Sequence, residues 1–301
     1  MRDPSYRRGM IHSSIYLALA GAFFTALSLI YTSGLLKKHG ELSPNVSVLF
    51  TYLVASVMLC VLVDITALMH ALSQPDIMWY IIAASALLFL SRILYTYAYK
   101  HIDAGYVTLF SSFTPIYTVA TAWWMLHTLP SADQLLGIFF ITTSVLVIFW
   151  QPMRPGKPHY RAYVAAFLST IPAAISIIFQ KKALAVISPV HLTFASFVLI
   201  TGFSLAYAII TSKKIPLGSL YKQGLAHHRL WLLIGILTAS AHICFFYVVE
   251  QHHAAAAQAA QRSSILFQIL LAYVLLNEKN NIIMKLAGGI IALASITLLL
   301  G

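Results

Sequence analysis

Long apolar runs alternate with short polar connections along the whole chain. A helix that crosses a membrane needs about 20 predominantly apolar residues. Ten stretches meet this requirement, at residues 14–36, 46–70, 77–99, 104–126, 132–150, 162–186, 189–211, 229–249, 254–276 and 282–300. The pattern therefore predicts an all-α integral membrane protein with ten transmembrane helices.

Composition and charge exclude a water-soluble domain. Of the 301 residues, 60% are apolar and 9% are charged, whereas about 25% of the residues in a soluble domain are charged. A net charge of +11 can indicate nucleic-acid binding, but the basic residues here lie in short clusters between the apolar runs. That placement is typical of loops beside anionic lipid headgroups. We therefore expect the lipid bilayer, and no nucleic acid, as a partner.

The N-terminal segment allows two interpretations. Arg2, Arg7 and Arg8 precede apolar residues, and LALAG at 17–21 resembles a signal-peptide cleavage site. The apolar stretch before that site is too short for a signal peptide, and the hydrophobicity continues past it, which favours a retained span. Cys60 and Cys244 lie in separate apolar runs, so neither a disulfide nor a metal site is expected.

Internal repetition divides the chain into two five-helix halves, 1–150 and 162–301, joined by a proline-containing linker at 151–161. The first and sixth spans both end in a Lys-Lys pair and are both followed by Ser-Pro. A shift of 151 residues also superposes several polar and glycine positions, namely His101 on His252, Ser112 on Ser263, His127 on Glu278, Gly137 on Gly288 and Ser144 on Ser295. Because each half has an odd number of spans, the second copy enters the membrane from the opposite side. This arrangement predicts the inverted repeats of secondary transporters.

The segment LLNEKNNIIMKLAGGIIALASITLLLG at 275–301 resembles the end of an EamA-type repeat of the drug/metabolite transporter superfamily. Such repeats carry a Gly-Glu pair after the fourth helix and a glycine about ten residues later. Asn277-Glu278 and Gly288 hold these places in the second half, and His127 and Gly137 in the first. The chain departs from the pattern in two places, because Asn277 replaces the usual glycine and His127 the usual glutamate.

The resemblance implies ten helices in two inverted repeats around a central cavity that opens alternately to the two sides of the membrane. Members of the superfamily move amino acids, nucleotide sugars, other metabolites and drugs, usually outward in bacteria. It thus implies a multi-pass protein of the cell inner membrane that acts on a small-molecule substrate without a cofactor. Its oligomeric state is left open.

Arg262 is a charged residue inside an apolar span. A lone charge at the bilayer centre costs about 2.5–3.5 kcal/mol on insertion scales, so its side chain should face protein or water. At helical spacing Gln258, Gln261, Arg262, Ile265 and Gln268 form one stripe. The ninth span is therefore expected to turn a polar face inward.

Arg92 raises the same question in the third span. Tyr95 and Tyr99 follow three and seven residues later and share its helix face. His242, near the middle of the eighth span, could carry a coupling proton, although a core histidine with satisfied hydrogen bonds is the alternative. These eight residues form the predicted substrate site, namely Arg262, Arg92, Gln258, Gln261, Tyr95, Tyr99, His242 and Gln268.

The two arginines have a structural and a functional interpretation. In the structural one they bond helix-end carbonyls or pair with Asp64 or Glu250, the acids nearest in depth. In the functional one at least one of them faces the cavity and binds a carboxylate or phosphate of the substrate, because the planar guanidinium suits bidentate recognition. Prolines inside the fourth and sixth spans, Pro115 and Pro172, are expected to be hinges or static kinks.

The distribution of positive charge and the family resemblance predict opposite orientations in the membrane. The odd-numbered connections carry twelve Lys or Arg, and the even-numbered ones with the N-terminus carry five. The positive-inside rule then places both termini outside, whereas the family resemblance places both inside.

Three classes of function are compared. The first is a secondary transporter for a small zwitterionic or anionic metabolite, with an amino acid as default substrate and export as default direction. A drug or cationic-amine exporter is the alternative within transport, and it would require acidic or aromatic cavity residues. A non-transporting scaffold or receptor is the alternative outside transport. Catalytic residues are not expected, because HExxH, GxSxG and paired intramembrane acids are all missing.

Overall fold

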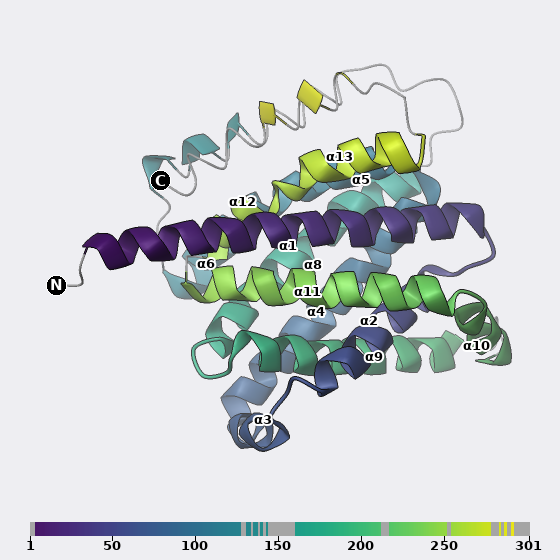
Figure 1. Ribbon diagram of the computed structural model, residues 1–301, viewed down its shortest axis with the longest axis horizontal. Helices are drawn as coiled ribbons and strands as arrows, with labels where there is room; N and C mark the ends of the chain where they lie inside the picture. Colours follow the sequence, from purple (N-terminus) through teal and green to yellow (C-terminus); the bar gives the residue numbers. More distant parts are fainter. Residues whose placement is uncertain are drawn as a thin grey trace.

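The computed structural model describes residues 4–127, 131–133, 135–137, 139–140, 143, 160–211, 217–251, 254–277, 283, 286–287 and 290–291. The regular elements within these ranges are all helical, and the long helices lie side by side in one bundle (Figure 1). They are α1 (Pro4–Lys38), α2 (Pro44–Cys60), α3 (Ile65–Leu72), α4 (Pro75–His101), α5 (Ala104–Phe110), the 3₁₀ helix η1 (Ser111–Phe113), α6 (Thr114–Leu126), α8 (Tyr160–Ala183), α9 (Pro189–Thr211), α10 (Leu217–Ala226), α11 (His228–Gln251), α12 (Ala254–Gln261) and α13 (Ser264–Leu275).

Five helices are long and apolar enough to cross a membrane, namely α1 over Tyr16–Lys38, α4, α8, α9 and α11. The predicted second span is a pair of helices, α2 and α3, bent by 115°, which raises the number to six if the pair is one span. The bend occurs where Asp64 starts a new helix, since its side chain accepts hydrogen bonds from the backbone N–H groups of Thr66 and Ala67. The predicted fifth and tenth spans lie largely outside the described residues. The multi-pass helical class is thus confirmed, and the count of ten spans is not.

The predicted fourth and ninth spans are each divided into shorter helices. The fourth is divided into α5 and α6 by η1, and the ninth into α12 and α13 by a turn at Arg262 and Ser263. Pro115 sits in the first turn of α6, where a missing N–H costs no helical hydrogen bond. Pro172 lies within the continuous α8. The two breaks coincide under the 151-residue shift that superposes Ser112 on Ser263.

Both broken spans end in the same backbone conformation. His127, after α6, has φ 51°, and Asn277, after α13, has φ 55°. This left-handed conformation commonly ends a helix and favours glycine. These two residues lie 150 positions apart, whereas the shift that superposes Ser112 on Ser263 is 151 positions.

The two halves pack as exchanged pairs of helices. The first helix of one half packs along the third long helix of the other, so α1 contacts α11 and α8 contacts α4. The counterparts α2 and α9 pack against each other. The helices α1 and α11 approach closely, since a Cβ atom at Gly21 would lie 3.0 Å from Cys244 Cβ. Small residues at such contacts let helix backbones pack tightly in a membrane protein.

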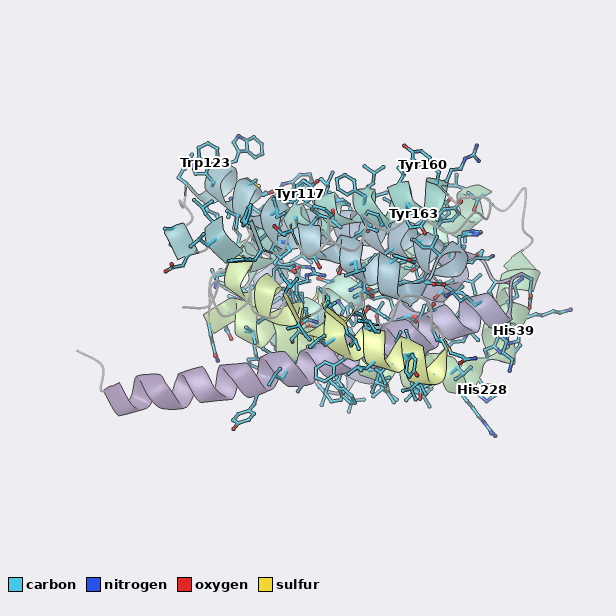
Figure 2. All side chains as sticks on the ribbon, turned by 90° about the horizontal axis from the view of Figure 1, so that it is seen from above. His39, Tyr117, Trp123, Tyr160, Tyr163 and His228 are labelled. Atoms are coloured by element: carbon cyan, nitrogen blue, oxygen red, sulfur yellow. The ribbon has the colours of Figure 1, made fainter. Side chains whose placement is uncertain are left out.

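Contacts at the helix termini define two ends of the bundle. At the first, called the Lys37 end, Lys37 Nζ lies 4.0 Å from Asp103 Oδ1, and the His39 and His227 rings lie 4.1 Å apart. At the second, called the Lys181 end, Lys181 Nζ donates to the backbone oxygen of Glu250 at 3.0 Å. Figure 2 places His39 and His228 at one end of the long axis and Trp123 at the other.

The first helices of the two halves run in opposite directions. α11 begins beside His227 at the Lys37 end and finishes beside Glu250 at the Lys181 end, about 36 Å away for its 24 residues. The last turn of α1 lies at the first end and the last turn of α8 at the second. The described helices therefore have the antiparallel relation that inverted repeats require.

Candidate substrate-binding site

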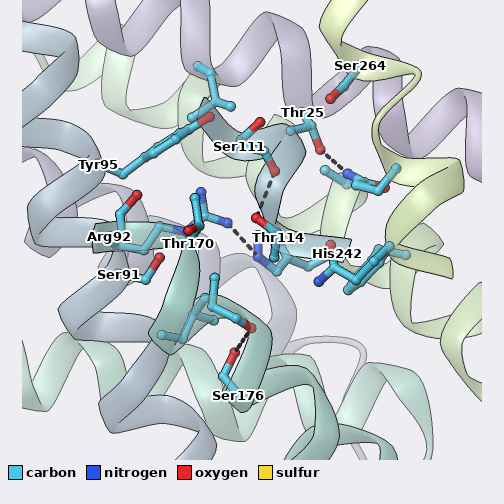
Figure 3. A pocket seen from close by; sticks show the side chains of 18 of the residues that line it. Thr25, Ser91, Arg92, Tyr95, Ser111, Thr114, Thr170, Ser176, His242 and Ser264 are labelled. Atoms are coloured by element: carbon cyan, nitrogen blue, oxygen red, sulfur yellow. Dashed lines mark hydrogen bonds between the residues drawn. The ribbon is translucent and has the colours of Figure 1, made fainter. Parts of the chain in front are cut away.

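The predicted site residues converge on one cavity of about 120 Å³ at the centre of the bundle (Figure 3). Seven of the eight line it, from α4, α11, α12, α13 and the turn between the last two. The eighth, Tyr99, lines a smaller neighbouring chamber. A cavity of this size has room for several water molecules. Side chains from both halves thus surround a polar space inside an apolar bundle.

Arg92 projects from α4 toward α11, where its Nη2 lies 3.2 Å from His242 Nε2 (Figure 3). The other ring nitrogen of His242, Nδ1, lies 2.9 Å from the backbone oxygen of Thr238 and donates to it. With Nδ1 protonated, Nε2 accepts the hydrogen bond from Arg92, so this geometry holds the neutral imidazole. This arrangement is that of a core histidine whose two ring nitrogens are both hydrogen-bonded, which is the alternative considered for His242.

Arg262 lies in the turn between α12 and α13, and its Nη2 donates to Gln258 Oε1 at 2.9 Å. The prediction that Arg262 continues a helical stripe was wrong in this respect, because the helix stops at Gln261. The break instead lets Arg262 and Ser264 face the cavity together from the start of α13. The guanidinium is thereby placed at a gap between two short helices.

Neither arginine has an acidic partner among the described residues. The ion pairs of that part of the chain are Lys37 with Asp103 and His39 with Glu41. Asp64 instead caps α3, which excludes the predicted pairing of a buried arginine with this acid. The Nε atoms of Arg92 and Arg262 are buried and have no hydrogen-bond partner. Each guanidinium therefore keeps one N–H donor without a partner within the described protein.

Two glutamine side chains fix the wall formed by α12 and α13. Gln261 Nε2 donates to Thr25 Oγ1 on α1 at 2.6 Å, which ties the two halves together. Gln268 Oε1 accepts from the Tyr99 hydroxyl at 2.8 Å and from Thr108 Oγ1 at 2.5 Å. Tyr99 OH in turn lies 3.3 Å from Tyr95 OH. This buried network orients the aromatic wall of the cavity.

Sequence reasoning missed the part of the wall that α8 contributes. Ser169, Ala173, Ser176 and Gln180 line the cavity from this helix. They recur every three or four residues, which is the same stripe pattern that identified the ninth span. Because these residues are uncharged, their spacing in an apolar helix is only a weak indication that the helix faces a cavity.

Most of the polar side chains at this site can donate hydrogen bonds. Two guanidiniums, amide groups and hydroxyls supply hydrogen-bond donors, and the described residues of the cavity wall include no carboxylate. The described residues contain no cluster of His, Cys, Asp and Glu that could hold a metal ion. The bundle and its enclosed polar cavity are those of a multi-pass membrane transport protein.

Comparison with known proteins identifies the family. The sequence matches the EamA-like transporter family over residues 12–150 and again over 160–301. The chain therefore belongs to this family and is a membrane transporter of the drug/metabolite type with tandem EamA repeats. None of the curated proteins compared with it matches the sequence. A solved crystal structure, described only as that of a protein, shares the fold with a TM-score of 0.67 and 14% identity, over 96% of this chain and 97% of the other.

Proposed function

We propose that the chain is a secondary transporter that carries a small anionic or zwitterionic metabolite through the central cavity by alternating access. In this proposal ten helices form two inverted repeats, 1–150 and 162–301, joined by the linker 151–161, in the cell inner membrane. An amino acid is the default substrate and export the default direction. The antiparallel course of α1 and α8 and the exchanged packing of the halves support the inverted arrangement.

The observation that carries the substrate class is the pair of guanidiniums without carboxylates at the cavity. A buried arginine without a counter-ion is costly in a membrane, and the described part of the structure provides none for Arg92 or Arg262. A substrate carboxylate or phosphate would supply the missing charge. A cationic drug would meet repulsion from both arginines, which argues against the cationic-amine exporter.

Substrate recognition then follows from the free donors. A guanidinium offers the two parallel N–H donors that a carboxylate or phosphate accepts, and the Nε–H of each arginine has no partner within the described protein. Tyr95 and the amides of Gln258 and Gln261 lie beside them and can contact the remainder of the substrate. An ammonium group of a zwitterion would be received by the hydroxyls and amide oxygens, because they are the acceptors present.

A coupled proton is a further element of the proposal. His242 Nε2 is occupied by Arg92. When an anion draws Arg92 away, this nitrogen is left free to take a proton, and the positive charge stays balanced by the anion. Flux of the substrate should then respond to an imposed pH gradient. His242→Gln, which keeps a hydrogen-bond acceptor but cannot become a cation, should transport without that response.

Flux into proteoliposomes tests the function directly. The purified protein is reconstituted and offered a panel of radiolabelled amino acids, organic acids, phosphorylated metabolites and cationic amines. Arg262→Gln should abolish transport of the accepted substrate while the protein stays folded. Arg229→Gln is the matched control, because Arg229 is exposed on the first turn of α11. Preferential flux of cationic amines, or undiminished flux in Arg262→Gln, would contradict the proposal.

A further inference from the structure

A second, smaller chamber adjoins the central cavity. Its volume is about 40 Å³, and hydroxyl side chains form much of its wall, including Ser28, Thr32, Ser47, Thr51 and Thr96. It shares Arg92, His242 and Tyr95 with the larger cavity, while Arg262 belongs to the larger one alone. The hydrogen-bonded pair of Arg92 and His242 therefore stands at the boundary between two polar spaces.

Along α1, α4 and α11 the smaller chamber is displaced from the larger cavity in the direction of the bundle axis. On α1, which runs toward the Lys37 end, the larger cavity stops at Leu29 and the smaller chamber continues to Thr32. On α4, which runs the same way, the larger cavity stops at Tyr95 and the smaller chamber reaches Tyr99. The smaller chamber is thus displaced toward the Lys37 end.

The chambers have the same order on α11, which runs toward the Lys181 end. On α11 the smaller chamber begins at Thr238, nearer the Lys37 end, and the larger cavity extends to Phe246. On α8 the larger cavity runs from Ser169 to Gln180, next to Lys181, and on α13 it includes Gln268, which bonds Tyr99 of the smaller chamber, so the two spaces lie side by side along these two helices. The larger cavity therefore extends toward the Lys181 end.

We infer that the smaller chamber is the Lys37-side half of the translocation path and that the hydrogen bond between Arg92 and His242 is the internal gate between the halves. This inference rests on the proposed transport function and adds the route and its closing element. Arg92 lines both chambers, so it is the one guanidinium of the described site that an anion meets on either side of the gate.

The bonding of the pair explains how a substrate opens it. A hydrogen bond from a guanidinium to a carboxylate or phosphate is stronger than one to a neutral imidazole. An anion in either chamber therefore competes with His242 for Arg92 and releases the gate. The hydroxyl groups of the smaller chamber supply donors for the anion after it passes. A cation cannot make this exchange, so the gate also contributes to selectivity.

Cysteine accessibility tests the gate without relying on flux. In a background of Cys60→Ser and Cys244→Ser, which removes both native cysteines, Ser176→Cys reports on the larger cavity and Thr51→Cys on the smaller chamber. Gly40→Cys and Gln74→Cys, both at exposed positions, mark the Lys37 and Lys181 ends. A membrane-impermeant thiol reagent is applied to either face of oriented vesicles.

With the gate intact, Thr51→Cys should react from the face that labels Gly40→Cys, and Ser176→Cys from the face that labels Gln74→Cys. Labelling from the opposite face should be at least about tenfold slower, the factor that loss of one charge-assisted hydrogen bond represents. His242→Ala and, independently, Arg92→Met should remove this difference. His242→Gln, which keeps an acceptor for Arg92, should preserve it.

Two results would overturn the gate. One is reaction of both reporters from the same face. The other is unchanged sidedness in folded His242→Ala and Arg92→Met. Either result together with anion flux leaves the proposed transport function standing. If Thr51→Cys and Ser176→Cys react from the expected opposite faces but no anion flux is measured, the gate is supported and the proposed substrate class is contradicted.

Discussion

At the break in the fourth span, the Ser111 hydroxyl donates to the backbone oxygen of Thr108 at 2.5 Å. The side chain at this break is therefore hydrogen-bonded within its own helix. At the corresponding break in the ninth span, 151 residues later, Arg262 extends a guanidinium that bonds Gln258 and leaves Nε unpaired. Both Ser111 and Arg262 line the central cavity. The two halves therefore have similar helix breaks beside the cavity, and only the break in the ninth span carries a charged side chain.

This difference shows that corresponding positions in the two halves of the fold carry side chains of different charge. Here the second guanidinium comes from Arg92, a residue of continuous α4, and it is paired with neutral His242. The first half thus contributes a guanidinium that is bonded to a histidine, and the second half one that is bonded to a glutamine.

The largest expected effect comes from making the second break resemble the first. Arg262→Ser removes the guanidinium and should lower flux of an anionic substrate about 100-fold, the size of effect given by a buried hydrogen bond between charged groups. Ser111→Ala removes a hydroxyl that bonds within its own turn, and flux should stay within about twofold. Proteoliposome uptake measures both variants. Equal losses in the two would show that the charge difference has no functional meaning.

Hydropathy predicted the long helices because apolar side chains must occupy the hydrocarbon core. The seventh span was placed at 189–211, and α9 runs from Pro189 to Thr211. The arginines could be assigned to the interior because charge is excluded from lipid, which is why the eight predicted residues lie around adjoining chambers. Whether they bind substrate stays a prediction.

Other features left little trace in the sequence. The break at Arg262 contains no proline or glycine, so helical spacing suggested a continuous helix. The pairing of Arg92 with His242 depends on α4 facing α11, and the periodicity of one helix does not say which neighbour it faces. The polar stripe of α8 is made of small residues that apolar helices also use for packing.

The next effect concerns Gln268 and its counterpart under the same shift, Tyr117. Gln268 is buried and accepts hydrogen bonds from Tyr99 and Thr108, whereas Tyr117 is half-buried and packs against Phe167. Gln268→Leu leaves two buried hydroxyls without that acceptor and should destabilise the protein by about 1–3 kcal/mol. Tyr117→Phe should stay within about 0.5 kcal/mol. Unfolding of the purified variants in detergent distinguishes them, and a larger loss for Tyr117→Phe would reverse this comparison.

A smaller effect should be shared by both halves. His127 and Asn277 hold left-handed backbone conformations, which cost an L-residue about 1–2 kcal/mol. Glycine avoids this strain but loses about 0.5–1 kcal/mol in conformational entropy. His127→Gly and Asn277→Gly should therefore each stabilise by about 0.5–1 kcal/mol in thermal unfolding. Ala122→Gly, inside α6, should instead destabilise by about 1 kcal/mol. Destabilisation by all three would mean that the two caps are not strained.

The smallest expected effect is a pH dependence at the Lys37 end, where His227 lies against His39 just before α11. Burial, and then the positive charges of His39 and Lys38, lower the pKa of His227 below its usual 6.5, and Glu41 partly offsets them. Between the lowered pKa and 6.5 the unfolded chain binds more protons than the folded one, so stability falls as pH falls through this window. His227→Gln should flatten the dependence of the unfolding temperature on pH between about 7 and 5, whereas His228→Gln, which changes an exposed neighbour, should leave the His227 contribution in place. If His227→Gln keeps the full slope, the histidine contact does not couple pH to the packing of the Lys37 end, and the two ends of the bundle respond alike to acid.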